Sequence, residues 1–227
     1  MATTGTSAFD MDFAEVAEES WERAGREMRS GHDLRTARRS FNLLTIEWQN
    51  RGINMWTIDE GAVPLISGTA EYTLPADTID LLEHVIREND GTSRQTDTNM
   101  SRISVSTYSS IPNKLQQGRP LQLFVKREAA APKVVVWPVP QNNNYTLQYW
   151  RMRRIEDAGR GVETQDMPFR FLPAIVAGLA YYIAMKVPEL EPRVLMLKQI
   201  YDEQFRMAAE EDREKATWRL VPQRARI

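Results

Sequence analysis

The apolar positions of the chain follow two spacings, which divide it into a helical, a strand-rich and again a helical section. The clearest helix lies in the first section, where apolar residues recur at steps of three and four and so share one helix face. These residues are Leu34, Ala37, Phe41, Leu44 and Trp48. Asp33 is suited to cap the start of this helix, and Gly52 stands where a glycine commonly ends one.

Three further helices are predicted around this one. Residues 9–28 form the first, and its early turns are acidic, which suits the positive end of a helix. Proline favours a first turn, so Pro168 and Pro173 place a third helix at about 168–187. A fourth begins near Pro192 and carries one apolar stripe. Its members are Val194, Leu197, Tyr201, Phe205 and Ala208.

The middle of the chain, residues 53–153, is typical of strands. Short runs rich in β-branched and aromatic residues alternate with turn-forming stretches such as SGTA and PQNNN. Residues 89–119 are polar and weakly patterned, which predicts a long loop with one short helix near residues 103–109. A polar excursion of this length is often a binding loop.

These patterns predict an α+β fold. We expect a four-helix bundle built from both chain ends, an inserted antiparallel β domain and an extended C-terminal arm, because each one-faced helix must bury its apolar side on another. The expected boundaries are residues 1–52 and 161–214 for the bundle helices, 53–160 for the β domain and 215–227 for the arm.

Composition narrows the class of protein. The 227 residues are 42% hydrophobic and 26% charged, with a net charge of −2, which argues against a general coat for nucleic acid. The absence of cysteine excludes disulfides, zinc–thiolate sites and cysteine nucleophiles. The longest apolar run, residues 171–185, is shorter than the roughly 20 residues that a bilayer requires, and the N-terminus does not have the pattern of a signal peptide. We therefore expect a soluble protein without a membrane partner.

Catalytic motifs are missing from the sequence. It contains no phosphate-binding glycine loop and no G-x-S-x-G elbow, so no catalytic, cofactor or metal site is predicted. His84 alternates with strand residues and is interpreted as a strand histidine rather than a base. Asp59 and Glu60 are adjacent, so in a strand they face opposite sides and cannot flank one glycosidic bond. We predict that the protein is not an enzyme.

Two charged segments are candidates for contacts. The run from Arg23 to Arg39 is interpreted mainly as a solvated surface that pairs with the acids of the first helix, and alternatively as a surface for phosphate or an acidic partner. The last thirteen residues combine arginines with apolar residues that cannot bury themselves. Because Trp and Arg are enriched at interface hot spots, we favour a docking arm over a disordered end. The arm residues are Trp218, Arg219, Leu220, Val221, Arg224, Arg226 and Ile227.

Four stretches in the same order resemble a known family. They are LRTARRSFNLLTIEWQNRGINMWTIDEG, EYTLPADTIDL, VVVWPVPQNNNYTLQYW and LPAIVAGLAYYIAMKVPE, and the resemblance spans roughly residues 34–210. Each motif alone is weak, but their joint order is similar to the head-to-tail adaptor proteins of short-tailed phages, the tail accessory or tail tubular protein A-like family.

The resemblance implies a structural virion protein of the neck or tail, assembled in the host cytoplasm. It implies a twelve-subunit ring that sits on the portal, presents a platform for the tail nozzle and lets double-stranded DNA pass without specific binding. In this family the C-terminal arm docks on the portal, and the loop 89–119 is a plausible nozzle contact. The open alternatives are a virion-associated cell-wall glycan hydrolase and a neck or completion protein of a long-tailed phage.

A ring also requires two complementary side faces on each subunit. The acidic first helix and the arginine-rich start of the second are the candidates for these faces. The candidate residues are Glu15, Glu18, Glu19, Glu22, Arg35, Arg38 and Arg39.

Overall fold

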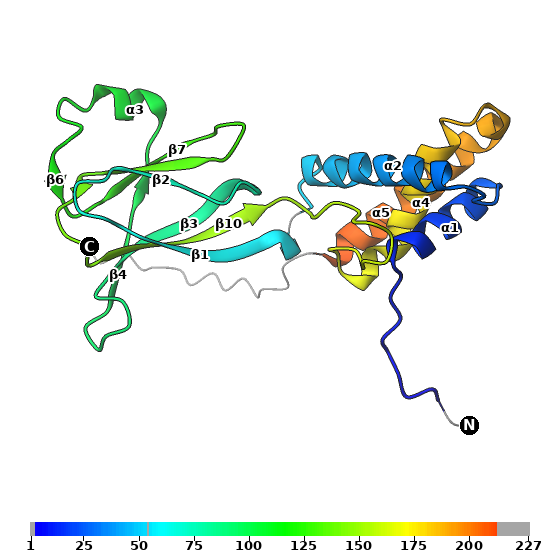
Figure 1. Cartoon of the computed structure of the whole chain (residues 1–227), viewed down its shortest axis with the longest axis horizontal. Helices are drawn as coiled ribbons and strands as arrows, with labels where there is room; N and C mark the ends of the chain where they lie inside the picture. Colours follow the sequence, from blue (N-terminus) through cyan, green and yellow to red (C-terminus); the bar gives the residue numbers. More distant parts are fainter. Residues whose placement is uncertain (1–2, 54, 213–227) are drawn as a thin grey trace, which may run out of the picture. The chain divides into compact units, whose positions relative to one another are not determined.

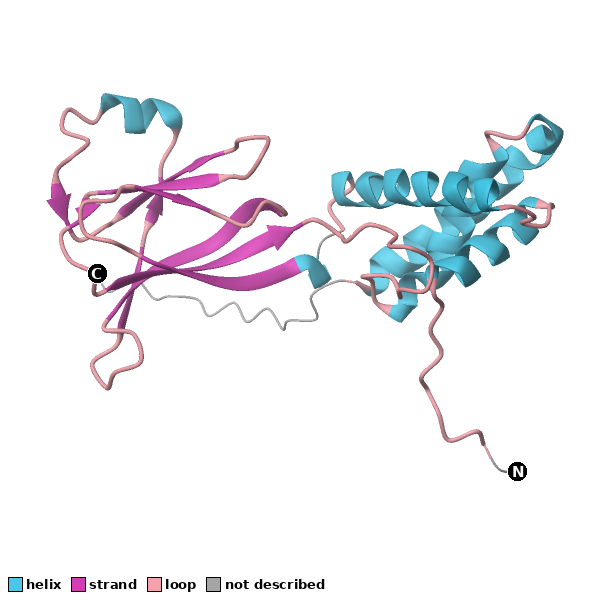
Figure 2. Cartoon of the chain, viewed as in Figure 1, coloured by secondary structure: helices cyan, strands magenta, loops and turns pink. Residues whose placement is uncertain are grey.

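The computed structural model describes residues 3–53 and 55–212 and confirms a mixed α+β protein with largely antiparallel sheets. The chain forms two compact units, which are separated between residues 55 and 56 and again between residues 155 and 156. The described residues before position 56 and after position 155 form the helical unit, and the segment 56–155 between them forms the β unit, which holds the strands drawn in magenta in Figure 2. Among the described residues, no helix is long and apolar enough to cross a membrane.

In its described residues, the helical unit contains four α-helices and two 3-10 turns (Figure 1). They are α1 (Phe13–Ala24), α2 (Gly31–Asn50), η2 (Phe169–Phe171), α4 (Leu172–Ala184), η3 (Pro188–Arg193) and α5 (Val194–Glu211). Helix α4 contacts each of the other three helices. Its near-continuous apolar run is explained by this position, because a helix that is covered on several sides has little room for polar residues.

Capping decides where the first two helices begin and end. Asp12 accepts a hydrogen bond from the Glu15 backbone N–H while Glu15 reaches back, which starts α1 later than predicted, and Gly25, at φ +102°, ends it early. The prediction that Asp33 caps α2 was wrong. Ser30 is the cap, and Asp33 lies buried in the first turn, where its carboxylate accepts hydrogen bonds from the Arg29 backbone N–H and the Ser30 hydroxyl.

The later helices also differ from their predicted starts. Pro168 precedes η2, and α4 begins only at Leu172 with Pro173 in its first turn, where the missing N–H costs no hydrogen bond. Pro192 lies inside η3, so α5 starts two residues after it. Most of the predicted apolar stripes are buried, including Trp48 of α2 and Tyr201 of α5.

Gly178 allows α4 to approach its neighbours closely. A Cβ at this position would lie 2.8 Å from a Leu44 methyl carbon and 2.9 Å from the Tyr201 ring. The Trp48 indole N–H donates to the Tyr201 hydroxyl at 2.9 Å on the same side, and this hydroxyl donates to Glu47. The contact among α2, α4 and α5 therefore depends on a small residue in the middle helix.

Replacing Gly178 by valine should lower the free energy of unfolding by about 1–3 kcal/mol, because the added methyl groups overpack a buried contact. Chemical unfolding followed by circular dichroism measures the change. Gly31→Ala is the control, because its Cβ meets nothing within 4 Å and its φ is not positive. Equal stability of the valine variant and the wild type would show that the helices separate at little cost.

The β unit is built from ten strands, one helix and a 3-10 turn that leads into the first strand. They are η1 (Met55–Thr57), β1 (Ile58–Pro64), β2 (Glu71–Thr73), β3 (Thr78–Glu88), β4 (Thr96–Asn99), β5 (Ser101–Arg102), α3 (Val105–Ser110), β6 (Gln117–Gly118), β7 (Gln122–Lys126), β8 (Lys133–Trp137), β9 (Val139–Pro140) and β10 (Tyr145–Arg153). Two four-stranded sheets have the orders β1-β10-β3-β4 and β2-β8-β7-β5. The pairs β5–β7 and β6–β9 are parallel, and the other pairs are antiparallel.

The core of the β unit lies between these two sheets. Leu81 and Ile86 of β3 and Leu147 of β10 belong to the same buried cluster as Leu123 of β7 and Val134 of β8. On β10, Tyr145, Leu147 and Tyr149 are buried while the residues between them are not, as expected when a sheet has one covered face.

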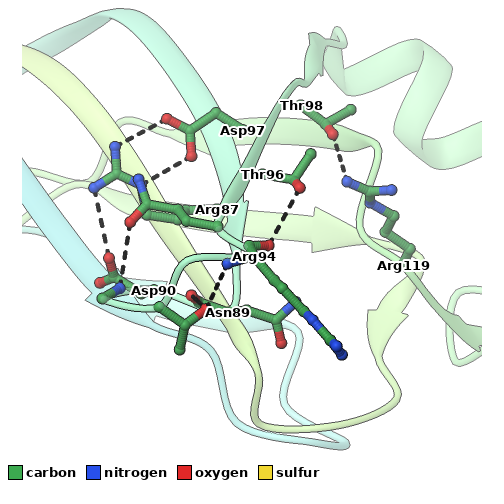
Figure 3. A network of polar contacts seen from close by, with 11 residues as sticks. Arg87, Asn89, Asp90, Arg94, Thr96, Asp97, Thr98 and Arg119 are labelled. Carbon is green, nitrogen blue, oxygen red and sulfur yellow. Dashed lines mark hydrogen bonds and ion pairs between the residues drawn. The ribbon is translucent and has the colours of Figure 1, made fainter.

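The polar stretch 89–119 is more ordered than a loop. It contains β4, β5, β6 and α3, and α3 confirms the short helix predicted near residues 103–109. Arg87 of β3 holds Asp97 of β4 through two hydrogen bonds of 2.8 and 2.9 Å, and it also faces Asp90 at 3.6 Å (Figure 3). Asn89, at φ +56°, begins the turn of this hairpin. In this stretch, ion pairs across the hairpin make the cross-strand contacts that apolar side chains make in other strands.

His84 lies in β3, as predicted, opposite Tyr149 of β10. The side chain is half-buried, and burial, with the positive charge of Arg102, lowers its pKa below the usual 6.5. The folded chain therefore keeps this imidazole neutral at a pH at which the unfolded chain protonates it. The stability contribution is present above about pH 6.5 and decreases as the pH falls below it.

His84→Gln should reduce the loss of stability between about pH 7 and about pH 5, because this uncharged residue does not titrate there. Urea unfolding of wild type and variant at both pH values tests the difference. His32→Gln replaces the chain's other histidine, which is exposed on α2, and is the matched control variant. An unchanged pH dependence in the His84 variant would contradict the prediction.

Candidate functional site

The acidic face of α1 points away from the core. Glu15, Glu18 and Glu22 are exposed, and Glu19 pairs with Arg23 one turn later at 2.7 Å. Glu15 is engaged in the cap at the start of the helix. No cation lies within ion-pair distance of Glu18 or Glu22 in the described part of the chain. These two carboxylates are therefore available to a partner.

The three arginines of α2 differ in their surroundings. Arg35 and Arg39 are exposed, and Leu43 and Ile46, at 55% and 52% exposure, continue the same stripe at helical spacing. Arg38 is half-buried, with its guanidinium 6.0 Å from the Phe13 ring and one N–H donating to the Arg160 carbonyl at 2.8 Å. Arg38 thus binds its own chain, and Arg35 and Arg39 are left on the surface.

The arginine-rich run makes fewer pairs with α1 than its interpretation as a solvated, paired surface expected. Arg29 pairs with Glu27, and Arg26 lies over the Trp21 ring at 5.6 Å. Within the described residues, no carboxylate pairs with Arg35 or Arg39. The run therefore leaves unpaired positive charge on the surface of the helical unit.

A groove lies beside this charge. We call it the Trp21 groove; its lining residues are Trp21, Arg26, His32, Asp33, Thr36, Arg39, Leu43, Lys186 and Val187. Lys186 and Val187 also line a second groove, which continues to Met185 and Leu195. Met185 and Leu195 are exposed at 50% and 76%. The surface is cationic at the end beside α1 and apolar toward the start of α5.

A third groove, which we call the N-terminal groove, lies along the segment that precedes α1. Its lining residues are Phe9, Met11, Glu19, Arg23, Leu172, Pro173 and Val176. Trp21 and Glu19 are two residues apart in one helix, so at about 100° per residue their side chains lie on nearly opposite sides of it. The Trp21 groove and the N-terminal groove therefore flank α1 on opposite sides.

Sequence reasoning named Arg35, Arg38 and Arg39 as contact residues. It missed three residues that line the Trp21 groove, which are Trp21, His32 and Lys186. Lys186 directly follows the apolar run at residues 171–185, and a lysine at the end of a buried helix signals a position near the surface. Its ammonium donates to the Ser40 hydroxyl at 2.6 Å, and burial lowers its pKa. The predicted arm residues, from Trp218 to Ile227, lie outside the described residues.

Among the described residues, no group of three or more His, Asp or Glu is placed to hold a metal ion. Asp59 faces Arg151 and Arg153 at 3.4 and 3.0 Å, and Glu60 follows on the other face of β1. Burial and the hydrogen bond to Glu47 raise the pKa of Tyr182 to about 12. A phenol held in this state stays protonated and contributes to packing.

Arg38→Ala should lower the free energy of unfolding by about 1 kcal/mol, because it removes a hydrogen bond to a carbonyl and a contact with the Phe13 ring. Arg35→Ala is the matched control and should leave stability within about 0.5 kcal/mol, since it is an exposed substitution. Thermal unfolding of both variants measures these changes in the free energy of unfolding. Equal effects would show that Arg38 is as free as its neighbours.

Of two comparisons with known proteins, one found a match. No curated protein matches the chain. The family model described as SU10 adaptor protein matches residues 11–226, which is nearly the whole sequence. The chain therefore belongs to the SU10 adaptor protein family and is a phage adaptor protein.

Proposed function

We propose that this protein is the head-to-tail adaptor of a short-tailed phage. In this role it forms a ring, twelve-fold as in the family it resembles, beneath the portal and joins the portal to the tail nozzle. The observation that carries the proposal is the family match over residues 11–226. For this role we propose the division expected from the sequence, with bundle helices at 1–52 and 161–214, a β domain at 53–160 and an arm at 215–227.

The charge distribution supports a ring of identical subunits. Glu18 and Glu22 of the helical unit are exposed and have no ion-pair partner among the described residues, and the same holds for Arg35 and Arg39. In a head-to-tail ring, each subunit meets its neighbour through two different surfaces, so opposite charges on them favour one register. The acidic residues Glu15, Glu18, Glu19 and Glu22 are proposed to face the arginines of the next copy.

The low net charge supports a channel through which DNA moves. A protein that neutralises many phosphates binds DNA strongly and releases it only at high salt. The chain carries 29 basic and 31 acidic residues, so it has no net attraction for a polyanion. We therefore propose that double-stranded DNA passes through without specific binding.

The C-terminal arm is proposed to lock the adaptor to the portal. Trp218, Leu220 and Val221 supply apolar anchors, and Arg219, Arg224 and Arg226 supply charge for an acidic neighbour. The β domain, including the segment 89–119, is proposed to face the nozzle. These assignments describe a structural protein of the virion neck rather than an enzyme.

Native mass spectrometry tests the adaptor and the arm separately. The full chain should form a closed multi-subunit complex with its portal protein, and deletion of residues 215–227 should reduce the bound fraction strongly. Loss of any portal complex with the full chain would overturn the adaptor proposal. Full binding after the deletion would leave the adaptor in place and remove the arm from the interface.

A further inference from the structure

Trp21 carries a polar group without a partner. The side chain is 2% exposed, and its indole N–H has no hydrogen-bond acceptor among the described residues. An indole nitrogen only donates, so this group calls for an oxygen that the chain itself does not supply. Buried donors are almost always satisfied in folded proteins. Trp21 lines the Trp21 groove, and its N–H is covered in the free chain, so an acceptor bound in the groove reaches it only when the lining side chains shift.

The rest of the Trp21 groove carries more positive than negative charge, with Arg26, Arg39 and Lys186 against one acid. Arg26 lies against the Trp21 ring, and Arg39 is exposed without a carboxylate partner in the described residues. The acid in the lining is Asp33, and one of its carboxylate oxygens accepts from both the Arg29 backbone N–H and the Ser30 hydroxyl at 3.1 Å. The groove therefore offers several donors and positive charges to an incoming carboxylate.

Apolar surface accompanies these donors. Leu43 is 55% exposed, and Val187 lines the same groove. A ligand that fits the groove therefore combines a carboxylate with an adjacent apolar side chain. Such a pair distinguishes a peptide segment from a simple anion, because a simple anion leaves the apolar surface in water.

The segment before α1 has this composition. Phe9 is 75% exposed, and Asp10 beside it is exposed, with one carboxylate oxygen accepting only from the next backbone N–H at 2.9 Å. This segment lies along the N-terminal groove, on the side of α1 opposite Trp21. Two complementary surfaces on opposite sides of one helix are suited to a head-to-tail contact. In such a contact, the first surface of each copy binds the second surface of the next copy.

We propose that the Trp21 groove holds residues 8–12 of a second copy of this chain. The Asp10 carboxylate accepts from the Trp21 N–H and faces Arg26 and Arg39, while Phe9 packs on Leu43 and Val187. The inference rests on the proposed ring and specifies its subunit contact. It extends the basic surface beyond Arg35 and Arg39 to a groove that includes a residue of α1.

Disulfide crosslinking tests this contact without background from native cysteines of this chain, because the chain contains none. Ala8→Cys and Leu43→Cys are combined in one full-length chain, assembled with the portal protein and oxidised. The expected result is a ladder of covalent multimers on a denaturing gel, lost on reduction. The matched control combines Ala8→Cys with Lys198→Cys, a pair that joins the segment to an exposed residue of α5, and should remain monomeric.

The possible results distinguish a failure of the proposed contact from a failure of the proposed ring. A portal-bound ring of normal mass that gives no ladder with the groove pair would overturn the contact and leave the ring standing. An intramolecular crosslink within a monomer would also overturn it, because the segment would then occupy the groove of its own chain. Absence of any ring in native mass spectrometry would remove the proposed function and this contact with it.

Charge reversal provides a second measurement in case the cysteine variants fold poorly. Asp10→Lys and Arg39→Asp should each reduce assembly, and the two together should restore it, since the opposite charges then face each other in exchanged positions. Asp202→Lys, an exposed reversal on α5, controls for the change in net charge. Additive losses in the double variant would contradict the contact.

Discussion

Burial of α4 is the constraint on which the helical unit depends. This helix is apolar on nearly every side, and it must be covered by α1 and α2 from one end of the chain and α5 from the other. Gly178 at its middle brings Leu44 and Tyr201 close to its backbone. The two ends of the sequence are therefore held in one unit, whose remaining surfaces are free for other contacts.

Those surfaces carry charge that is separated rather than balanced locally. In the β unit, arginines and aspartates pair directly, as Arg87 and Asp97 do, and the charge serves the fold. In the helical unit, Glu18, Glu22, Arg35 and Arg39 have no such partners among the described residues. Exposed pairs add little stability, so leaving these groups unpaired costs the monomer little and keeps them available for association.

The sequence predicted what depends on local pattern. The apolar stripe of α2, the strand character of residues 53–153 and the short helix α3 follow from spacing and composition alone. The cap of α2 was missed because Ser30 and Asp33 are both good capping residues, and the choice between them depends on where Gly31 and His32 lie. Likewise, the order within residues 89–119 comes from cross-strand ion pairs, which periodicity does not detect.

The candidate contact surfaces were also predicted only in part, because some of their residues lie far apart in the sequence. The acids of α1 and the arginines of α2 were visible in the sequence, but the Trp21 groove joins residues that are about 165 positions apart, from Trp21 to Val187. Only folding reveals that Arg38 is bound internally and that Lys186 lies beside Arg39. If the segment before α1 and the Trp21 groove on the other side of this helix make the subunit contact, as proposed, α1 links the two surfaces and sets one fixed angle from each copy to the next. Repetition of a fixed angle is what closes a ring, so the geometry of one short helix would set the geometry of the assembly.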